Sequence, residues 1–360
     1  MVEIKDVTFS YPGEETGGSL HHINFEIRPG ECVLLCGKSG CGKTTITKLI
    51  NGLIPHFNQG NLQGETVVDG MTVADTPMYQ LSEKVGSVFQ NPKSQFFNID
   101  SDSELAFGLE NNGVDPEIIR KSVKKAVTDL HIESLLHRNI FSMSGGEKQS
   151  LAFASVYAMN PNIYVLDEPT ANLDREAIAL LQQQLKQIKQ QGKSIIIAEH
   201  RLYFLAEILD RAVFIIDGKI VREFSREEFL SLTDEERREM GLRTLYQRNP
   251  SYQIKGQGGG ELEVRNLAYR DKHHAIFENI SFSASAGDII GILGKNGAGK
   301  TTLMRCVAGL LKESSGEIYY HGKPVRGKDR NSICYMIMQD VNHQLVGESV
   351  WKDCELSTDG

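Results

Sequence analysis

The chain has 360 residues, of which 40% are hydrophobic, 24% are charged and 8% are aromatic. These values are typical of globular proteins and exclude wholesale disorder, collagen-like and coiled-coil architectures, and the length leaves room for two domains of about 150 residues. With 47 acidic against 39 basic residues the net charge is -8, so we expect no nucleic acid partner.

Cysteine spacing and apolar runs limit the class of protein further. The six cysteines form no CxxC pair, which favours reduced thiols in a cytosol and argues against a zinc site. The sequence starts without a basic and apolar leader, and no apolar run approaches the roughly 18 residues of a spanning helix. We therefore expect any role at a membrane to need a membrane-embedded partner.

Two stretches of the chain repeat each other. EIKDVTF at residues 3–9 parallels EVRNLAY at residues 263–269, and residues 23–45 parallel residues 280–302. The stretch between the copies is charged and helix-prone, and it ends in the glycine-rich GQGGG at 256–260, which favours a flexible joint. The predicted organisation is a first domain over 1–224, a linker over 225–260 and a second domain over 261–360.

Within each copy, short apolar runs of strand length alternate with segments of helical period, as at CVLLC, IYVLD, SIIIAEH and AVFIID. This alternation predicts an α/β fold with a largely parallel sheet that is covered on both faces. Residues 91–157 contain few strand-like runs, and DPEIIRKSVKKAVTDL within them offers Asp115 as a cap and Pro116 at the first helical position. We predict a helical insertion there.

Each copy carries a glycine loop between a predicted strand and a predicted helix. GKSGCGKT at 37–44 and GKNGAGKT at 294–301 both fit GxxxxGK[ST]. In such a loop the backbone N–H groups bind phosphates, the lysine neutralises their charge and the last hydroxyl binds Mg²⁺. The sequence therefore predicts a P-loop nucleoside triphosphatase module repeated in tandem. The predicted nucleotide-binding residues of the two loops are Gly37, Ser39, Gly40, Gly42, Lys43, Thr44, Thr45, Gly294, Asn296, Gly297, Gly299, Lys300, Thr301 and Thr302.

Two further motifs follow the first loop. IYVLDEP ends a predicted strand with Asp167, suited to hold Mg²⁺ through water, and Glu168, suited to orient or deprotonate an attacking water. Such a pair is usually a solvated turn, and its distance behind a phosphate loop is what favours the catalytic interpretation. FSMSGGEKQ places Ser144 at an N-cap, which by itself indicates only a capped helix.

The order of these motifs, namely phosphate loop, Gln90, MSGGE, VLDEPTANLD and AEH, resembles that of the nucleotide-binding subunits of ABC transporters. The resemblance covers nearly the whole chain. It implies that Gln90 senses Mg²⁺ and the hydrolytic water, that Glu168 and His200 complete the catalytic set, and that Tyr11 stacks on adenine. ATP would be the substrate and Mg²⁺ the cofactor, with ligands among Thr44, Gln90, Asp167, Thr301 and Gln339.

The same resemblance implies a contact between modules. Ser144, Gly145 and Gly146 would form a signature that closes on the γ-phosphate held by an opposite module, again an anion at a helix N-terminus. Residues 171–174 would form the D-loop. Gln339 would be the nucleotide-sensing glutamine of the second copy.

The chain departs from the family pattern in three places. MSGGE replaces the commoner LSGGQ, so Glu147 adds a charge near bound nucleotide, and Asp271 stands where the first copy has Tyr11, so the adenine-stacking ring is expected to be absent from the second copy. The second copy reaches Gln339, but the sequence stops at Gly360, before a signature, a second carboxylate pair or a second switch histidine.

Two consequences are expected from this incomplete second copy. Hydrolysis would need two chains paired through their first modules, with Lys43 from one chain and Ser144 from the other, unless the chain is a fragment of a longer tandem ATPase. Residues beyond about Gly258 would expose apolar faces that strands normally cover, and they would unfold first.

The tandem arrangement together with QNPKSQFF, MSGGEKQ and AEHRL resembles the ATPases of energy-coupling-factor importers. This implies uptake of a vitamin or a metal ion, integral transmembrane and substrate-binding partners, pairing as a homodimer or with a second ABC ATPase, and a place at the cytoplasmic face of the membrane. The alternative is a soluble tandem ABC protein that acts on ribosomes as a translation factor. Such factors have a long basic linker and NHLD, whereas residues 225–250 hold six acidic and five basic residues and 171–174 read ANLD.

Two features leave alternatives open. Histidine pairs precede the second predicted strand of each copy and suggest polar turns, with a metal role as the alternative: His21, His22, His273 and His274. An apolar helix face could dock a membrane partner or simply pack within the insertion: Leu105, Phe107 and Leu109.

Overall fold

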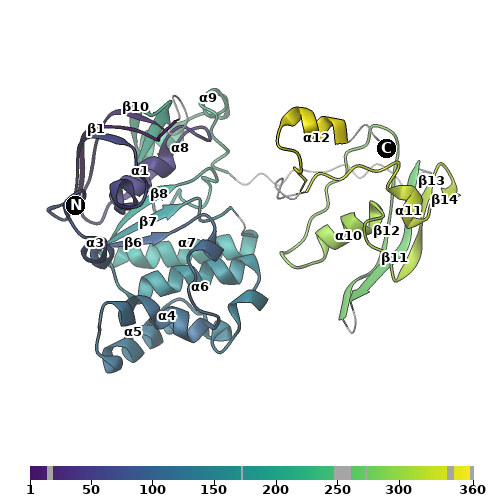
Figure 1. Ribbon diagram of the computed structural model, residues 1–360, viewed down its shortest axis with the longest axis horizontal. Coiled ribbons are helices and arrows are strands. Elements are labelled where there is room, and N and C mark those ends of the chain that lie inside the picture. The colour runs from purple at the N-terminus through teal and green to yellow at the C-terminus, as the bar shows by residue number, and fades with distance from the viewer. Residues whose placement is uncertain (14–18, 172, 247–260, 272–273, 339–343, 357–360) are drawn as a thin grey trace. The chain divides into compact units, whose positions relative to one another are not determined.

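The computed structural model describes residues 1–13, 19–171, 173–246, 261–271, 274–338 and 344–356. The chain divides into two compact units, Met1–Pro250 and Ser251–Gly360, each of which is described by itself (Figure 1). Within the described ranges, the helices are all too short or too polar to cross a membrane.

A six-stranded sheet lies at the centre of the first unit, made of β3 (Cys32–Cys36), β6 (Val85–Val88), β7 (Ile163–Asp167), β8 (Ser194–Ala198), β9 (Arg211–Ile216) and β10 (Lys219–Ser225). The strand order is β10-β9-β3-β8-β7-β6. All neighbouring pairs are parallel except β9 and β10. β3 and β8 are buried along their whole length, as central strands covered on both faces must be. The predicted α/β fold is confirmed in this unit.

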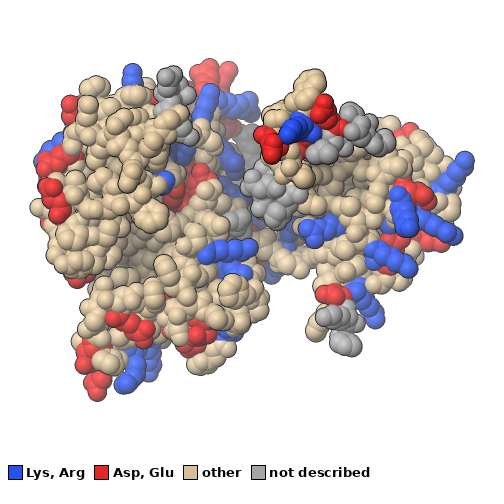
Figure 2. All heavy atoms as spheres, viewed as in Figure 1, with Lys and Arg blue, Asp and Glu red and all other residues tan. Residues whose placement is uncertain are grey.

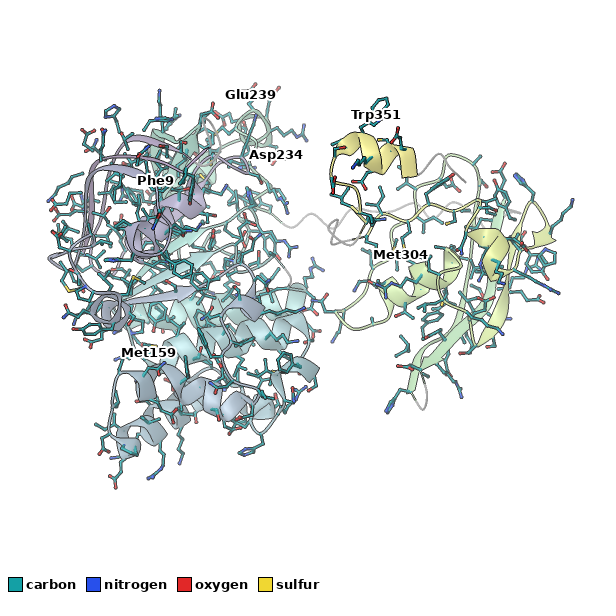
Figure 3. The ribbon with its side chains drawn as sticks, viewed as in Figure 1. Phe9, Met159, Asp234, Glu239, Met304 and Trp351 are labelled. Carbon is teal, nitrogen blue, oxygen red and sulfur yellow. The ribbon has the colours of Figure 1, made fainter. Side chains whose placement is uncertain are left out.

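A smaller antiparallel sheet covers one face of the central sheet. It consists of β1 (Val2–Ser10), β2 (Leu20–Ile27), β4 (Asn61–Val68) and β5 (Met71–Thr72) in the order β2-β1-β4-β5. The helices α1 (Lys43–Ile50), α2 (Leu53–His56) and α3 (Met78–Lys84) accompany it. Phe9 of β1 and Ile46 of α1 lie in one buried cluster with residues of β3 and β8 (Figure 3). The start of α1 is therefore held between the two sheets.

Helices cover the other face, and most of them lie between β6 and β7 in the chain (Figure 1). They are α4 (Ser101–Asn111), α5 (Pro116–Asp129), α6 (Gly145–Ala158) and α7 (Arg175–Gln190), with single 3-10 turns at Pro92–Ser94, Glu133–Leu135 and Ile140–Ser142. Asp115 caps α5 and Pro116 opens it, as predicted. Leu105 and Leu109 are 1% and 7% exposed within the helical core, so these two side chains serve packing and are not free to dock a partner.

Close packing joins α6 to the central sheet. The rings of Phe153 on α6 and Tyr164 on β7 have centroids 6.4 Å apart. A Cβ at Gly86 of β6 would lie 2.3 Å from Cγ1 of Val156 on α6, closer than two carbon atoms can approach. Glycine at this position therefore lets the helix lie directly on the strand.

Residues 225–246 correct the predicted start of the linker, because they belong to the first unit. They form the end of β10, then α8 (Arg226–Ser231) and α9 (Asp234–Glu239), each opened by a capping box. Phe229 is fully buried and Leu245 is 3% exposed in the same core as α6 and α7. Most of the charged residues that suggest a linker are exposed, with the exception of Arg237 at 3%, whereas Phe229 and Leu245 anchor the segment in the core. The predicted joint at 256–260 lies outside the described residues.

The second unit contains β11 (Leu262–Asp271), β12 (His274–Ala284), β13 (Ser315–Tyr320) and β14 (Lys323–Pro324) in the order β12-β11-β13-β14. Its helices are α10 (Lys300–Val307), α11 (Gly327–Arg330) and α12 (Val350–Leu356). The buried core is small and includes Val264, Leu303 and Ile318. Several large apolar side chains are exposed, among them Tyr335 at 94% and Trp351 at 75%.

One predicted strand of this unit is not formed. Residues 288–293, DIIGIL, were expected to be the strand that enters the second phosphate loop, and the chain there has no regular structure. Ile289 is 99% exposed and Leu293 is 84% exposed. A central parallel strand needs hydrogen-bonded neighbours, and the described residues of this unit place no strand beside this segment.

Candidate nucleotide-binding and hydrolysis site

The first phosphate loop joins β3 to α1. Gly37 has φ +148°, and a Cβ there would lie 2.2 Å from the carbonyl oxygen of Ile215 on β9. Gly42 has φ +107° and directly precedes α1. Lys43 is 4% exposed, and its Nζ donates to the carbonyl oxygens of Gly37 at 3.1 Å and Lys38 at 2.9 Å. The loop therefore curls around an ammonium group beside the free N–H groups of a helix N-terminus. The other predicted residues of this loop and of the first turn of α1 are Ser39, Gly40, Thr44 and Thr45.

A hydroxyl and a carboxylate meet beside this loop. The Oγ1 of Thr44 donates to Oδ1 of Asp167, at the end of β7, over 3.1 Å. Burial raises the pKa of Asp167, although the Thr44 hydrogen bond opposes this shift. These are oxygen ligands of the kind that Mg²⁺ prefers, and Mg²⁺ usually takes one or two protein ligands and completes its shell with water and phosphate. The residues present therefore fit the ion, although no group of three or more His, Cys, Asp or Glu suited to a metal occurs in the described parts of the chain.

Glu168 joins two other predicted site residues. Gln90 donates from Nε2 to Oε2 of Glu168 at 2.9 Å, and Nε2 of His200 lies 3.3 Å from Oε1 of the same carboxylate. Glu168 has φ +43°, a left-handed conformation that is uncommon for a side chain of this size. Gln90, Glu168 and His200 directly follow β6, β7 and β8, so they meet at the carboxyl ends of parallel strands, where open α/β sheets bind ligands.

The surroundings of His200 lower the pKa of its ring. Burial is the largest effect and lowers its pKa, and the positive charges of Lys43 and Arg243 lower it further. The carboxylate of Glu168 opposes this shift. The Nε2 of His200 also lies 3.5 Å from Oγ of Ser39 in the phosphate loop, so the ring spans the loop and the carboxylate.

Sequence reasoning missed Glu199, which positions this histidine. The side chain is 3% exposed and accepts hydrogen bonds from the backbone N–H groups of His200 at 2.6 Å, Arg201 at 3.2 Å and Thr170 at 3.2 Å, as well as from the Thr170 hydroxyl. Burial raises its pKa. A glutamate directly after the buried strand SIIIA was the available signal, because an acidic residue in that place needs several donors.

Tyr11 lies at the end of β1, near α1. Its hydroxyl accepts a hydrogen bond from Nζ of Lys48 at 3.3 Å, and the same ammonium lies 5.4 Å from the ring centroid. The edge of the ring meets Phe9 with centroids 4.9 Å apart. The predicted adenine-stacking ring is therefore tied to the helix that begins at Lys43.

The predicted signature residues Ser144, Gly145 and Gly146 form the start of α6, away from the cluster around Lys43. Ser144 and Glu147 form a capping box, and Arg138 pairs with Glu147 at 2.5 Å. Burial alone would raise the pKa of Glu147, but hydrogen bonds from Ser144 and Arg138 outweigh it and lower the pKa. Among the described residues, no hydrogen bond joins Ser144 to the phosphate loop.

The second phosphate loop has the same local form with fewer partners. Lys300 donates from Nζ to the carbonyl oxygens of Gly294 and Lys295, both at 2.7 Å, and Gly299 with φ +85° precedes α10. The hydroxyl of Thr301 has no hydrogen bond to a carboxylate in the described part of this unit. The remaining predicted residues of the turn and helix start are Asn296, Gly297 and Thr302. Gln339 lies outside the described residues, as does position 172 of the D-loop.

The histidine pair of the first unit lies on the surface. His22 is exposed and its Nδ1 lies 2.8 Å from Oδ1 of Asp6, and His21 is exposed as well. In the second pair, His273 lies outside the described residues. Both histidines lie within β2 rather than in a turn before it, so the predicted polar turn is wrong for this pair.

Comparisons with known proteins agree on one family. The sequence profile described as ABC transporter matches residues 20–171 and 277–355. Two Treponema denticola proteins named as ABC transporter ATP-binding proteins are 46% and 36% identical, over 99% and 100% of this chain and 74% of each relative. Among solved structures, cbiO1 from Clostridium perfringens, part of the ABC transporter complex cbiONQ, has a TM-score of 0.57 and 26% identity over 65% of this chain and 91% of that chain. The cassette MJ0796, in a dimeric post-hydrolysis state bound to ADP and Pi, has a TM-score of 0.55 and 26% identity over 63% of this chain and 99% of that chain.

Proposed function

Because this chain belongs to the ABC transporter family of ATP-binding proteins and is therefore an ATP-hydrolysing enzyme, we propose that it hydrolyses ATP at Lys43 and Glu168 to energise a membrane importer. The observation that supports this site most strongly is the carboxylate of Glu168, which both Gln90 and His200 contact beside the Thr44 and Asp167 pair.

The proposed chemistry follows from the position of each group. Lys43 neutralises the β- and γ-phosphates, and Thr44 and Asp167 hold Mg²⁺, which supplies further positive charge to the phosphate oxygens when bound. Glu168 orients the attacking water and accepts its proton. The ring of His200 contacts the γ-phosphate, and His200 and Gln90 both contact Glu168, so the base is held in place from both sides.

The site is completed by a second chain in this proposal. Ser144 opens α6 with exposed N–H groups near it, a place where a helix binds an anion. No hydrogen bond among the described residues joins it to the phosphate loop of its own unit, so it is available to the ATP of a neighbouring ABC module. The dimeric state of the similar cassette MJ0796 supports such pairing. Residues 261–360 are proposed to be a second, incomplete copy of the module, which the second family match and the matching order of the small sheets support.

We propose that the importer is of the energy-coupling-factor kind and that this chain lies at the cytoplasmic face of the membrane. The similarity to cbiO1, part of the complex cbiONQ, supports this. An exposed apolar patch near Gln90 offers a place for a membrane subunit: Phe97 is 74%, Ile99 63% and Phe141 76% exposed. The segments that carry Ile99 and Phe141 are adjacent, because the N–H of Ile140 donates to the carbonyl oxygen of Ile99 at 2.8 Å.

The test of the site is Glu168→Gln in the full chain. ATP turnover should fall by about 100-fold or more, because a general base contributes at least that factor, while Mg-ATP should remain bound in a two-chain assembly detected by light scattering. Glu235→Gln, which changes an exposed carboxylate on α9, is the matched control and should turn over ATP like the parent. Turnover of Glu168→Gln within about threefold of the parent would refute the proposed base.

The test of the partner is affinity purification from membranes of cells that express the chain. Integral membrane subunits should co-purify with the parent and be lost with Phe141→Ser, which should leave ATP turnover in solution unchanged. Co-purification with ribosomes in place of membrane subunits would refute the importer and favour a translation factor.

A further inference from the structure

The segment of residues 226–246, here called the arm, is fixed to the first unit at both ends. Phe229 near its start is fully buried, and Leu245 near its end is 3% exposed. Between them runs α9, whose ends Asp234 and Glu239 are labelled in Figure 3. Figure 2 shows basic and acidic side chains together over this part of the unit. The arm is therefore an ordered part of the ATPase unit.

The turn that follows α9 meets the phosphate loop. Gly241 has φ +69°, and a Cβ there would lie 3.0 Å from Cγ and 3.1 Å from Cε of Lys38. The N–H of Gly241 donates to the backbone carbonyl oxygen of Arg238 at 3.0 Å, and the N–H of Leu242 donates to that of Arg237 at 2.7 Å. This turn is thus closed by backbone hydrogen bonds and lies in contact with the side chain of a phosphate-loop residue.

Arg243 comes two residues after this contact. Its side chain is exposed, and its guanidinium has no hydrogen bond or ion pair with any residue in the described part of the chain. Burial and Lys43 lower the pKa of His200 most, and the charge of Arg243 is close enough to contribute to the same shift. An unpaired guanidinium therefore follows, two residues on, the turn that contacts Lys38 of the phosphate loop.

We propose that Arg243 binds the γ-phosphate of ATP, so that the arm supplies a cation that favours the triphosphate over the diphosphate. The inference rests on the proposed site at Lys43. Guanidinium groups present several donors in a plane and suit phosphate oxygens better than other cations do. ADP lacks the γ-phosphate, so a contact confined to that group changes ATP affinity and leaves ADP affinity alone.

The experiment measures the dissociation constants of Mg-ATP and Mg-ADP by titration of the full chain in a Glu168→Gln background, which keeps ATP intact. Protein is kept at dilutions where light scattering shows single chains, so that pairing does not contribute to the apparent affinity. Arg243→Ala should weaken Mg-ATP by about fivefold, an effect expected for one solvent-exposed charge contact. Mg-ADP affinity should stay within about twofold, and Arg243→Lys should recover part of the loss.

Arg238→Ala is the matched control, because it removes the same charge from the same arm at a residue that is not among the main causes of the pKa shift at His200. The control should change neither affinity. The proposal is overturned if Arg243→Ala leaves the ratio of the two affinities unchanged, or if Arg238→Ala changes it equally, since a general positive field would then explain the result. Undiminished ATP binding by Lys43→Ala would instead refute the proposed site, which separates the two failures.

Discussion

Replacing Glu199 by alanine should both destabilise the first unit and displace His200 from its position in the candidate site. The carboxylate is 3% exposed and accepts three backbone N–H bonds, from Thr170, His200 and Arg201, and one from the Thr170 hydroxyl. Alanine leaves these donors without an acceptor, which costs about 1–3 kcal/mol of folding free energy for each donor that water does not reach. The cost is reduced because the buried carboxylate itself is unfavourable, as its raised pKa indicates.

If two of these donors stay without a hydrogen bond to water, and the cost of burying the carboxylate is subtracted, Glu199→Ala should lower the free energy of unfolding by about 2–3 kcal/mol. Glu199→Gln keeps one acceptor oxygen but turns an N–H group toward other donors, so it should fall between parent and alanine. Turnover should fall in the same order, because the backbone of His200 loses its anchor.

The assay is urea unfolding followed by far-UV circular dichroism, together with ATP turnover. Tryptophan fluorescence would not serve, since the single tryptophan, Trp351, lies in the second unit. Glu207→Ala is the control: its ion pair with Lys186 lies on the surface, and the parent midpoint should be retained. The reasoning is refuted if Glu199→Ala unfolds at the parent midpoint and keeps the parent turnover.

Three further predictions concern the same unit. Gly241→Ala and Gly192→Ala impose similar backbone strain, with φ of +69° and +75°, but only the methyl group at position 241 would contact the phosphate loop. ATP affinity should therefore fall about twofold for Gly241→Ala and stay unchanged for Gly192→Ala. Equal losses of ATP affinity in titrations of the two variants would contradict the contact. Because burial, followed by nearby cations, lowers the pKa of His200 below 6.5, the unfolded chain takes up this proton first, so stability should fall as pH drops through 6.5. His200→Gln should lack that part of the pH dependence in urea midpoints, and an identical profile would show that other groups cause it. Arg138→Ala removes a half-exposed partner of Glu147, so it should lower the free energy of unfolding by less than about 1 kcal/mol. It should also raise the pKa of Glu147, which NMR titration can measure. An unchanged pKa of Glu147 would contradict the pairing.

Local chemistry made the main elements of the candidate site predictable. A glycine loop between strand and helix specifies its own shape, and two strand ends in one parallel sheet bring Asp167 beside Thr44. The sequence also indicated the cap of α5, because Asp115 and Pro116 act within one turn. Each of these predictions depends on residues close in sequence or on the known geometry of a parallel sheet.

Contacts that depend on tertiary packing were not predictable in this way. The many charges of residues 225–246 favour a linker in the sequence, but Phe229 and Leu245 are buried because they pack against the rest of the first unit. The strand expected at 288–293 has the right composition, but a strand forms only beside neighbours, and a composition does not supply them. Glu199 was overlooked because its donors come from Thr170 and from the following loop, which only the folded chain brings together.

The close approach at Gly86 links a buried strand to Ser144, the residue that we propose faces a partner. Any side chain at this position would push Val156, and with it α6, away from the sheet. A displacement at Val156 would tilt the whole of α6. Ser144 caps the same helix twelve residues earlier, roughly 18 Å away, and would move with it. Gly86→Ala should thus slow ATP turnover at normal ATP affinity, a separation that kinetics and titration can measure. The absence of a side chain on this buried strand thereby fixes the position of the surface that we propose binds a neighbouring ATPase.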